Sequence, residues 1–540
     1  MKKDENKTHL SFVEKITHLS HKSLLQKLFL LKVLNIFLVQ TWFVPDEYWQ
    51  SLEVAHRMVF GYGHLTWEWK VGLRSYIYTL LFAFPYKVLQ VLGLDSVFLL
   101  KFVPRLIQGG LSALSELLFY LTVKNLFGAT TAAYSLFCFV TSWFWWYCQT
   151  RTLINTFETN IVCIALYFYS KHALPSKKVT IRKTGNKFLS KHFNFVVIAA
   201  VVGFYVRPTS ASVWLPLFSI YLLQIYKNYS FSLCFKVTLN ILTKALVVFA
   251  FLALVDRICY GEWVSVHLNF LFFNLIDNKG TFYGEHPWHW YFTQGLPVVF
   301  SIHLLFCIYG FWLYESNVEN QAKSNTVQQH FLLIFKSSIT TTLLLYSIPG
   351  HKEFRFILVL MPFVSFYSGH AISTLNKKYS KLCLLLVSNV LAALYFGLEH
   401  QRAPSMLLDQ LYKLKPEPNE QTLFLMPCHS TPFYSHLHLP TRLKFITCEP
   451  DLENTPGYKD ESVLFYEDPN KWLESEYRSS FDNCSEVGLP NYIVLYDVLY
   501  DKLYETFSTC YYDCYKTLHT LFPEGRVGRN ALILCKKKFH

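Results

Sequence analysis

Long apolar runs separated by short polar segments fill the chain from residue 24 to residue 396. Runs of about 17 to 25 mostly apolar residues have the length that crosses a bilayer as a helix. The pattern therefore predicts a polytopic α-helical membrane protein. The candidate segments are 24–44, 73–92, 97–123, 129–147, 153–170, 193–206, 212–226, 237–255, 296–313, 331–348, 357–372 and 382–396.

Composition agrees with this prediction. Of the 540 residues, 52% are hydrophobic and only 16% are charged, which is too little charge for a soluble globular protein. The net charge of +13 comes from lysines and arginines in short segments between apolar runs, a pattern typical of cytoplasmic loops. We therefore expect no nucleic-acid partner. Residues 1–21 are polar and no cleavage site follows, so 24–44 is predicted to be a retained first span.

Charge also predicts the topology. Segment 171–191 carries seven Lys or Arg and no acidic residue, so we place it with the N-terminus in the cytoplasm. An even number of crossings must separate the two, and five candidates lie between them. We expect 73–92, which Arg74, Pro85 and Lys87 interrupt, to be re-entrant or interfacial. If 193–226 is a hairpin that turns at Arg207-Pro208, the chain has about eleven crossings.

This topology gives three regions. We expect a cytoplasmic N-terminus at 1–23, a transmembrane catalytic domain at 24–398 and a luminal domain at 399–540. The catalytic domain would have luminal loops at 45–96 and 256–295. Five polar groups of residues then share the luminal face. They are Asp46, 150–158, Arg207, 256–294 and 351–356. If 193–226 were one span and not a hairpin, His351 would lie in the cytoplasm.

The tail, 399–540, is polar and rich in proline, with short alternating stretches at 423–426, 462–465 and 492–495. It predicts a small α/β or α+β domain. Six cysteines favour disulfides in an oxidising compartment, although their pairing does not follow from the sequence. The alternative is a zinc site at Cys510 and Cys514, for which no second pair has convincing spacing. The six are Cys428, Cys448, Cys484, Cys510, Cys514 and Cys535.

Two signals in the tail depend on its compartment. Asn483 begins a weak glycosylation acceptor that has meaning only in the lumen. Lys537 and Lys538 resemble a dilysine retrieval signal, which acts only in the cytoplasm. We favour the other interpretation of these lysines, a solvated basic end.

A charged hexapeptide, HKEFRF at 351–356, lies between two apolar runs. Ionisable groups persist at a bilayer edge where they face water, pair with each other or bind an anionic ligand. We expect His351, Lys352 and Arg355 to bind a phosphate, with Glu353 as the salt-bridge partner that orients them. The alternative is a basic flank that anchors two spans.

Two adjacent carboxylates, Asp46 and Glu47, follow the first span in the sequence Val-Pro-Asp-Glu-Tyr-Trp-Gln. A half-shielded carboxylate can accept a proton from a sugar hydroxyl, so we predict that they are catalytic, with Asp46 as the base. Pro-Asp-Glu is also a good opening for a helix, and both roles can hold at once. The aromatic residues that follow, among them Trp49 and Trp67, are of the type that stacks on sugars.

Residues 280–291 form an aromatic segment with glycine turns and two histidines. It suits a carbohydrate-binding lid, in which we predict roles for Tyr283, His286, Trp288 and His289. An interfacial aromatic belt is the alternative. The two histidines have no third ligand nearby, so we predict no metal site.

Arg207 and Arg151 border apolar runs on the same predicted face, and each is a further phosphate ligand or a plain membrane anchor. Together these groups describe transfer between lipid-borne groups. A base activates an acceptor hydroxyl, and a cationic cluster stabilises a departing phosphate. The chain has no GxGxxG or Walker loop, which argues against a nucleotide-sugar donor.

The hexapeptide resembles the HKEXRF signature of glycosyltransferase family 22, whose members are lipid-dependent mannosyltransferases of the GT-C fold. Pro-Asp-Glu at 45–47 is similar to the acidic first-loop motif of that family. Residues 45–69 and 280–294 resemble its branch that adds the third mannose to the glycosylphosphatidylinositol (GPI) core. Val44 stands where relatives that build the N-glycan precursor often carry histidine.

The resemblance implies an endoplasmic-reticulum membrane enzyme with a luminal active site. Its donor would be dolichyl-phosphate mannose, its acceptor a GPI-precursor glycolipid, and its product an α-1,2 bond formed with inversion. Asp46 would be the base, with His351, Lys352 and Arg355 near the donor phosphate, and neither metal nor cofactor is implied. The alternatives are a mannosyltransferase of the dolichol-linked N-glycan pathway and a membrane transporter. A transporter would be expected to show internal repeats, and the sequence has none that we recognise.

Overall fold

The computed structural model describes residues 13–173, 190–317, 326–375, 387–477, 484 and 488–537. The chain divides into two compact units, each built from two stretches of sequence. The helical unit comprises Met1–Asn35 and Leu106–Ala393, and the sheet unit comprises Ile36–Arg105 and Leu394–His540. The regions predicted at 1–23, 24–398 and 399–540 divide the chain differently, and their membrane placement stays a prediction.

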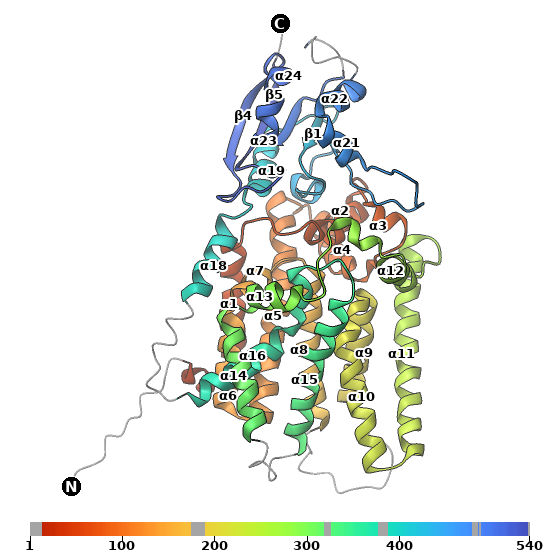
Figure 1. Ribbon diagram of the computed structural model, residues 1–540, viewed down its shortest axis with the longest axis vertical. Coiled ribbons are helices and arrows are strands. Elements are labelled where there is room, and N and C mark those ends of the chain that lie inside the picture. Colours follow the sequence, from red (N-terminus) through yellow and green to blue (C-terminus); the bar gives the residue numbers. More distant parts are fainter. Residues whose placement is uncertain are drawn as a thin grey trace, which may run out of the picture. The chain divides into compact units, whose positions relative to one another are not determined.

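Helices α8, α9, α10, α11 and α15 of the helical unit run side by side (Figure 1). Most lie where the apolar runs predicted them. The helices of this unit, including those that continue into the other, are α1 (His21–Leu38), α5 (Val97–Phe127), α6 (Ala129–Thr141), α7 (Trp143–Cys148), α8 (Ile154–Ala173), α9 (Lys191–Val206), α10 (Ala211–Asn228), α11 (Phe231–Tyr260), α14 (Ile302–Asn317), α15 (Thr326–Ser347), α16 (Met361–Thr374) and α18 (Val387–Leu398).

The predicted hairpin between 193 and 226 is confirmed. Helix α9 ends where Arg207 turns to an extended conformation, and Pro208 opens the short helix η4 (Pro208–Ser210) before α10. The Phe193 and Tyr221 rings lie 4.5 Å apart, and a Cβ built on Gly203 would lie 3.2 Å from Trp214. Because the start of α9 meets the middle of α10 and its end meets the start of α10, the two helices are antiparallel.

Two other predicted runs are broken helices. Segment 129–147 divides into α6 and α7 at Ser142. The region around 296–313 bends by 106° between Tyr291–Phe300 and Ile302–Ser316, at Ser301, whose φ is +48°. Polar backbone exposed at such breaks is tolerated inside a membrane only where protein or water covers it.

Three helices of the described residues are both long and apolar enough to cross a bilayer: Val97–Phe127, Phe231–Tyr260 and Phe354–Thr374. The bent pair gives a fourth if it is one span. The number of about eleven crossings therefore stays a prediction. Other helices are less apolar because they bury polar side chains. Helix α8, for example, buries Asn155, Glu158 and Asn160 among its apolar residues.

Short elements connect the helices of this unit between residues 266 and 360. The aromatic segment 280–291 has little regular structure beyond single turns. The HKEFRF motif leads into a 3-10 helix that continues directly into α16. These elements are α12 (Val266–Leu271), η5 (Phe272–Ile276), η6 (Lys279–Tyr283), η7 (Tyr291–Gly295), α13 (Leu296–Phe300) and η8 (Phe354–Leu360).

The sheet unit contains a five-stranded mixed sheet in the order β2-β1-β3-β5-β4. Strand β1 pairs in parallel with β2 and β3, whereas β5 is antiparallel to both β3 and β4. The prediction of an α/β or α+β tail is confirmed (Figure 1). The strands are β1 (Gln421–Leu425), β2 (Arg442–Phe445), β3 (Tyr492–Tyr496), β4 (Tyr511–Leu518) and β5 (Asn530–Lys536).

One of the three alternating stretches of the tail is not a strand. Residues 462–465 lie in helix α21 (Glu461–Glu467), whereas 423–426 and 492–495 fall on β1 and β3. The Asp460 side chain caps α21 by accepting a hydrogen bond of 2.9 Å from the Val463 amide. This N-cap, with Glu461 in the first turn, outweighs the apolar alternation that suggested a strand.

Helices cover both faces of the sheet. One face buries Ile493 and Leu495 against α21 and α22 (Pro469–Tyr477), and α19 (Ala403–Leu414) packs on β4 and β5. The first loop joins this unit through η2 (Tyr48–Leu52), α2 (Glu53–Phe60), α3 (Trp67–Lys70) and α4 (Tyr76–Val91). The remaining short helices are α20 (Tyr434–Leu437), α23 (Asp497–Lys502) and α24 (Tyr504–Ser508).

Helix α4 is the segment predicted not to cross the membrane. It contains Pro85 and packs against α2 within the sheet unit, and its membrane placement stays a prediction.

The expectation of disulfides in the tail is confirmed. The pairs are Cys428–Cys448, Cys484–Cys510 and Cys514–Cys535. Cys510 and Cys514, the alternative zinc pair, therefore belong to two different disulfides. Asn483 and Lys538 lie outside the described residues.

Candidate functional site

The HKEFRF motif forms a charge network of its own in the helical unit. Arg355 donates from Nε to Glu353 at 2.7 Å and pairs with the same carboxylate through a second nitrogen. His351 Nε2 lies 3.2 Å from the Glu353 carboxylate, on the same oxygen that Arg355 contacts. Glu353 thus holds the two cationic side chains together, so the predicted salt-bridge role of Glu353 is confirmed.

The aromatic segment 280–291 packs directly on this motif. Lys352 Nζ donates to the His286 carbonyl at 2.9 Å, and His351 Nδ1 lies 3.2 Å from the Gly284 carbonyl. The His286 amide in turn donates to the Gly350 carbonyl at 3.0 Å. A Cβ on Gly350 would lie 2.6 Å from Thr281, so this close approach needs glycine. Two segments far apart in the sequence therefore form one site.

Two further polar groups of this unit, Arg207 and the 150–158 turn, also lie next to the motif. Arg207 forms an ion pair of 3.1 Å with Glu158, and its guanidinium lies 4.9 Å from the Phe356 ring centre. Of the five polar groups predicted to share one face, the structure thus brings together the four in this unit. Arg151, the other candidate arginine, is buried and donates to the Tyr147 carbonyl at 2.8 Å.

Burial and charge set the protonation of the motif. Burial raises the pKa of Glu353, but Arg355 and His351 outweigh it and hold that pKa well below its usual range. Burial lowers the pKa of His351, and its hydrogen bond and charge contact with Glu353 more than offset this, so the pKa lies above its ordinary value. Burial lowers the pKa of Lys352, and Glu285 counters this in part. Glu353 is therefore an ionised carboxylate held in a fixed place, and its negative charge favours the protonated form of the basic side chains around it.

The aromatic segment presents exposed rings beside the network. Trp288 is 69% exposed and Tyr283 is 43% exposed, and His289 is exposed as well. His286 is different, because its ring stacks on buried Trp290 at 4.7 Å. Exposed aromatic faces next to cationic groups have the composition of a site for a sugar and its phosphate.

Asp46 and Glu47 begin the first helix of the sheet unit. Both are helical and lead directly into η2, and the Pro45 carbonyl accepts from the amides of Tyr48 and Trp49 at 3.0 Å. The interpretation of Pro-Asp-Glu as a helix opening is therefore confirmed. Glu47 is buried and Asp46 is partly exposed, so Asp46 is the more accessible carboxylate of the pair.

The aromatic residues after Asp46 are packed inside the sheet unit. Trp49 is 2% exposed and donates from Nε1 to the Thr431 carbonyl at 3.1 Å, and Phe433 lies against its ring at 4.9 Å. Trp67 is also buried. Packing against the tail accounts for both indoles in this conformation, and their role in binding a sugar stays a prediction.

A buried carboxylate fixes this helix to the tail. Glu53 has no exposed surface and accepts from the Phe433 amide at 2.7 Å and from the Ser435 amide and hydroxyl. Burial raises the pKa of Glu53 to about 7, against the opposing effect of these hydrogen bonds. We call this contact the Glu53 clamp.

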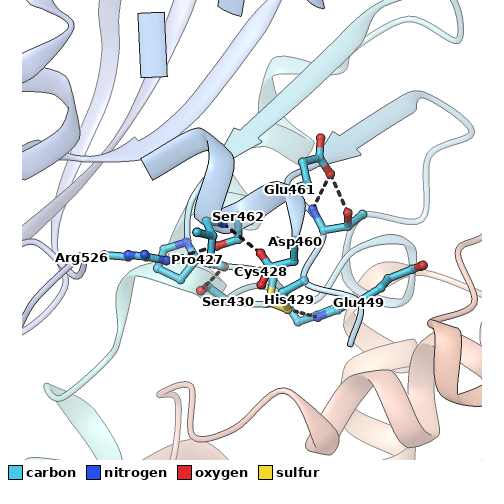
Figure 2. Close-up of a disulfide and its surroundings, with 12 residues drawn as sticks. Pro427, Cys428, His429, Ser430, Glu449, Asp460, Glu461, Ser462 and Arg526 are labelled. Atoms are coloured by element: carbon cyan, nitrogen blue, oxygen red, sulfur yellow. Dashed lines mark hydrogen bonds between the residues drawn. A yellow bond between two sulfur atoms is a disulfide. The ribbon is translucent and has the colours of Figure 1, made fainter. Parts of the chain in front are cut away.

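Histidines from the two segments meet along the same helix. His56 Nε2 lies 2.9 Å from His438 Nδ1, and His438 Nε2 lies 3.4 Å from Asp95. Nearer Asp46, the rings of His64 and His429 contact Trp49. Figure 2 shows His429 beside the Cys428–Cys448 disulfide.

His429 and these two cysteines also lie close enough together to hold a metal ion. The disulfide occupies the thiolates that such a site would need, so we infer no metal there.

Sequence reasoning missed two sets of residues. The first is the Glu53 clamp, whose partners are separated by about 380 residues and leave no local signal. The second is a fully buried ion pair of 2.5 Å between Lys32 and Glu116, in which Lys32 also donates to Gln149. An ionisable residue inside an apolar run marks such sites, and both Lys32 and Glu116 have that signal.

The sequence and fold are similar to those of known proteins. The model of the Alg9-like mannosyltransferase family matches residues 23–438. A mouse protein named GPI alpha-1,2-mannosyltransferase 3 is 42% identical over 504 residues, covering 92% of this chain and 86% of the relative.

Two solved structures share the fold. ArnT from Cupriavidus metallidurans, bound to undecaprenyl phosphate, has a TM-score of 0.60 at 11% identity and covers 95% of this chain and 97% of its own. The oligosaccharyltransferase of Archaeoglobus fulgidus has a TM-score of 0.51 at 14% identity, covering 90% and 70%. Both have the GT-C fold, which confirms the GT-C fold predicted for this chain, whereas the number of spans and the luminal place of the tail stay predictions.

Proposed function

Because the chain belongs to the Alg9-like mannosyltransferase family, we propose that it transfers the third, α-1,2-linked mannose to the GPI precursor in the endoplasmic-reticulum membrane. The observation that carries this proposal is the 42% identity to a GPI alpha-1,2-mannosyltransferase 3 across nearly the whole chain. The chain is accordingly a mannosyltransferase of GPI assembly. The proposal also includes the donor, the acceptor, the luminal active site, the number of spans and the site residues.

The proposed donor is dolichyl-phosphate mannose. A lipid phosphate as leaving group needs positive charge beside it, and the HKEFRF network supplies His351, Lys352 and Arg355 next to exposed aromatic residues. The ArnT structure of the same fold holds undecaprenyl phosphate, which supports a lipid phosphate as ligand. Arg207 would act at the edge of this site, since Glu158 already balances its charge.

In the proposed reaction, Asp46 takes the proton of the acceptor hydroxyl. The hydroxyl oxygen forms the new bond to the anomeric carbon of mannose as the bond from that carbon to the phosphate oxygen breaks. The electron pair leaves with dolichyl phosphate, and attack from the opposite side inverts the anomeric centre. Cations near the phosphate stabilise the charge that develops there, and no metal is required for charge balance.

Exposed Trp288, Tyr283 and His289 are the proposed contacts for mannose or the acceptor, with His286 holding their loop on the motif. The same role for Trp49 and Trp67 would require the first helix to move from the tail. We therefore rank the loop residues first among the sugar-binding candidates.

The test uses cells that lack their own enzyme for this step. Wild-type chain should restore the three-mannose GPI precursor. Asp46→Asn should leave the two-mannose precursor in place, with transfer reduced by about 10²-fold or more, because the variant loses its general base. Lipid profiling by mass spectrometry measures both species, and immunoblotting of membranes checks that the variant is made.

Two controls separate the possible outcomes. Glu47→Gln removes the buried neighbour and should reduce transfer less than Asp46→Asn. Asp451→Asn, a partly exposed carboxylate far along the chain in the tail, should leave transfer unchanged. Normal transfer by Asp46→Asn would remove Asp46 from the mechanism. In cells from which this chain itself is deleted, truncated dolichol-linked oligosaccharide with GPI intact would instead indicate the N-glycan pathway.

A further inference from the structure

A histidine of the tail lies on the same side of the first helix as Asp46. The His429 ring contacts the Trp49 ring edge-on with 4.8 Å between centres. Trp49 follows Asp46 by three residues in one helical stretch, and its amide donates to the Pro45 carbonyl at 3.0 Å. Residues three apart in a helix share a face, so His429 packs on the face that carries Asp46.

A neighbouring disulfide holds His429 in this place. Cys428, the preceding residue, is bonded to Cys448, and His429 Nδ1 lies 3.9 Å from Cys448 Sγ (Figure 2). The φ of His429 is +58°, in the left-handed region, which histidine adopts more readily than most residues other than glycine. The cross-link therefore fixes where the His429 ring lies.

The protonation state of His429 suits a partner of a base. Burial and the neighbouring His64 lower the pKa of His429 to about 4, and the opposing influence comes from Asp46. The imidazole is therefore neutral near pH 7, with one N–H donor and one acceptor nitrogen. A neutral N–H can orient a carboxylate and leaves it more basic than a full positive charge would.

We propose that His429 is a positioning residue for Asp46, so that the tail, through a disulfide-anchored loop, completes the site of the catalytic base. The imidazole orients the carboxylate toward the acceptor hydroxyl and keeps its place when the carboxylate takes the proton. No proton passes to His429 in this scheme. The inference rests on the proposed function, since it assumes that Asp46 is the base for mannosyl transfer.

The test compares two histidines of the same loop. His429→Asn removes the imidazole and retains a residue that tolerates left-handed backbone. His438→Asn is the matched control, because His438 also has a positive φ, of +48°, but contacts His56 and Asp95 rather than Trp49. Full-length protein in microsomes is assayed with dolichyl-phosphate mannose and two-mannose GPI.

We expect His429→Asn to lower kcat by roughly tenfold or more, with the KM for the donor within about threefold of wild type. His438→Asn should stay within about threefold in both constants. His429→Gln, whose side-chain amide N–H reaches farther from the backbone than that of Asn, should restore part of the rate. A purely structural role predicts a loss of active protein instead, with kcat per folded molecule unchanged. Equal kcat for His429→Asn and His438→Asn would overturn the proposal.

The two residues should also act as a unit. In an Asp46→Glu background the carboxylate is displaced by one methylene, so the orientation that His429 provides is already lost. Adding His429→Asn there should cost less than about threefold, against tenfold in the wild-type background. Equal factors in the two backgrounds would mean independent residues and would contradict the proposal.

The disulfides give a second, matched comparison. The cysteines of Cys428–Cys448 are 20 residues apart and those of Cys514–Cys535 are 21 apart, so removing either pair by Cys→Ser should destabilise the tail similarly. Only the first pair should lower kcat per folded molecule, because only it anchors His429. Identical kcat values for the two double variants would count against the proposal. Failure of the proposed function is a separate result, in which wild-type protein itself makes no three-mannose product.

Discussion

The two charged motifs of this chain are held in place by opposite means. In the helical unit, two of the three cations of HKEFRF, His351 and Arg355, are paired within the motif through Glu353. In the sheet unit, the helix that begins at Asp46 is held by the tail, through buried Trp49 and the Glu53 clamp. The ion pairs of the first motif are thus local in sequence, whereas the second motif depends on residues near 430.

This difference predicts which amino-acid substitutions disrupt each site. A network that is local in sequence keeps its geometry as long as its own few residues are intact. A helix fixed by distant residues depends on the fold of a whole domain and on a disulfide within it. We therefore expect charge substitutions to dominate in the first site and packing or cross-link substitutions to dominate in the second.

The largest effect is expected from Glu353→Ala. Removing one partner of a buried ion pair costs about 3 to 5 kcal/mol, and the lower end applies here because the Glu353 side chain is 24% exposed. Arg355 and His351 would both lose their shared carboxylate, so transfer should fall by about 10²-fold. Thermal unfolding in detergent and the mannosyl-transfer rate measure the two effects.

Glu285→Gln is the control for that substitution. Glu285 is exposed and acts on Lys352 only through its charge, so its loss should change stability by less than about 0.5 kcal/mol. A Glu353→Ala variant as stable and active as Glu285→Gln would mean that the motif does not depend on its internal pairing, and the comparison would fail.

The Glu53 clamp should show the next largest effect. Glu53→Ala leaves the Phe433 amide and both Ser435 donors without their acceptor, at a cost of about 3 kcal/mol. Glu53→Gln keeps one acceptor oxygen and should cost clearly less. Limited proteolysis of the tail in full-length protein measures the difference, and equal protection of the two variants would contradict the clamp.

The clamp also predicts a dependence on pH. The pKa of Glu53 is about 7 in the folded protein against an ordinary value of 4.5, so the folded state binds the Glu53 proton more tightly than the unfolded state does. The contribution of Glu53 to the free energy of unfolding is full below pH 4.5 and is lost as pH rises through 7. The total loss is on the order of 3 kcal/mol. Glu53→Gln should remove this part of the pH dependence of tail protection.

The same contrast explains how much could be predicted from the sequence. Periodicity located most helices, the turn at Arg207 and two strands, because each depends on residues close together in the chain. The HKEFRF site followed from one hexapeptide, and Glu353 was expected to orient its cations. The packing of Trp49, the Glu53 clamp and the place of His429 depend on contacts across about 380 residues, which one sequence cannot report.

One local signal was misleading, because apolar alternation at 462–465 is typical of a strand and Asp460 caps a helix there. The aromatic residues after Asp46 predict a sugar-binding surface. Trp49 and Trp67 are buried in this structure, and their role in binding a sugar stays a prediction. Aromatic side chains are equally suited to core packing and to sugar binding, so only their burial distinguishes the two roles. Burial of Trp49 and Trp67 depends on the folded structure and cannot be read from the local sequence.

The smallest effect concerns His351. Its pKa lies above the ordinary value because Glu353 outweighs the effect of burial, so its contribution to stability is full below about pH 6.5 and is lost as pH rises through the folded-state pKa. His351→Gln should therefore reduce stability by roughly 1 kcal/mol at pH 6 and by less at pH 8. Thermal unfolding of the wild type and His351→Gln at the two pH values gives this difference. Because Glu353 raises the pKa of His351, a Glu353→Gln background should remove the pH dependence of the His351→Gln effect. If that pH dependence persists in the Glu353→Gln background, its source lies outside the motif.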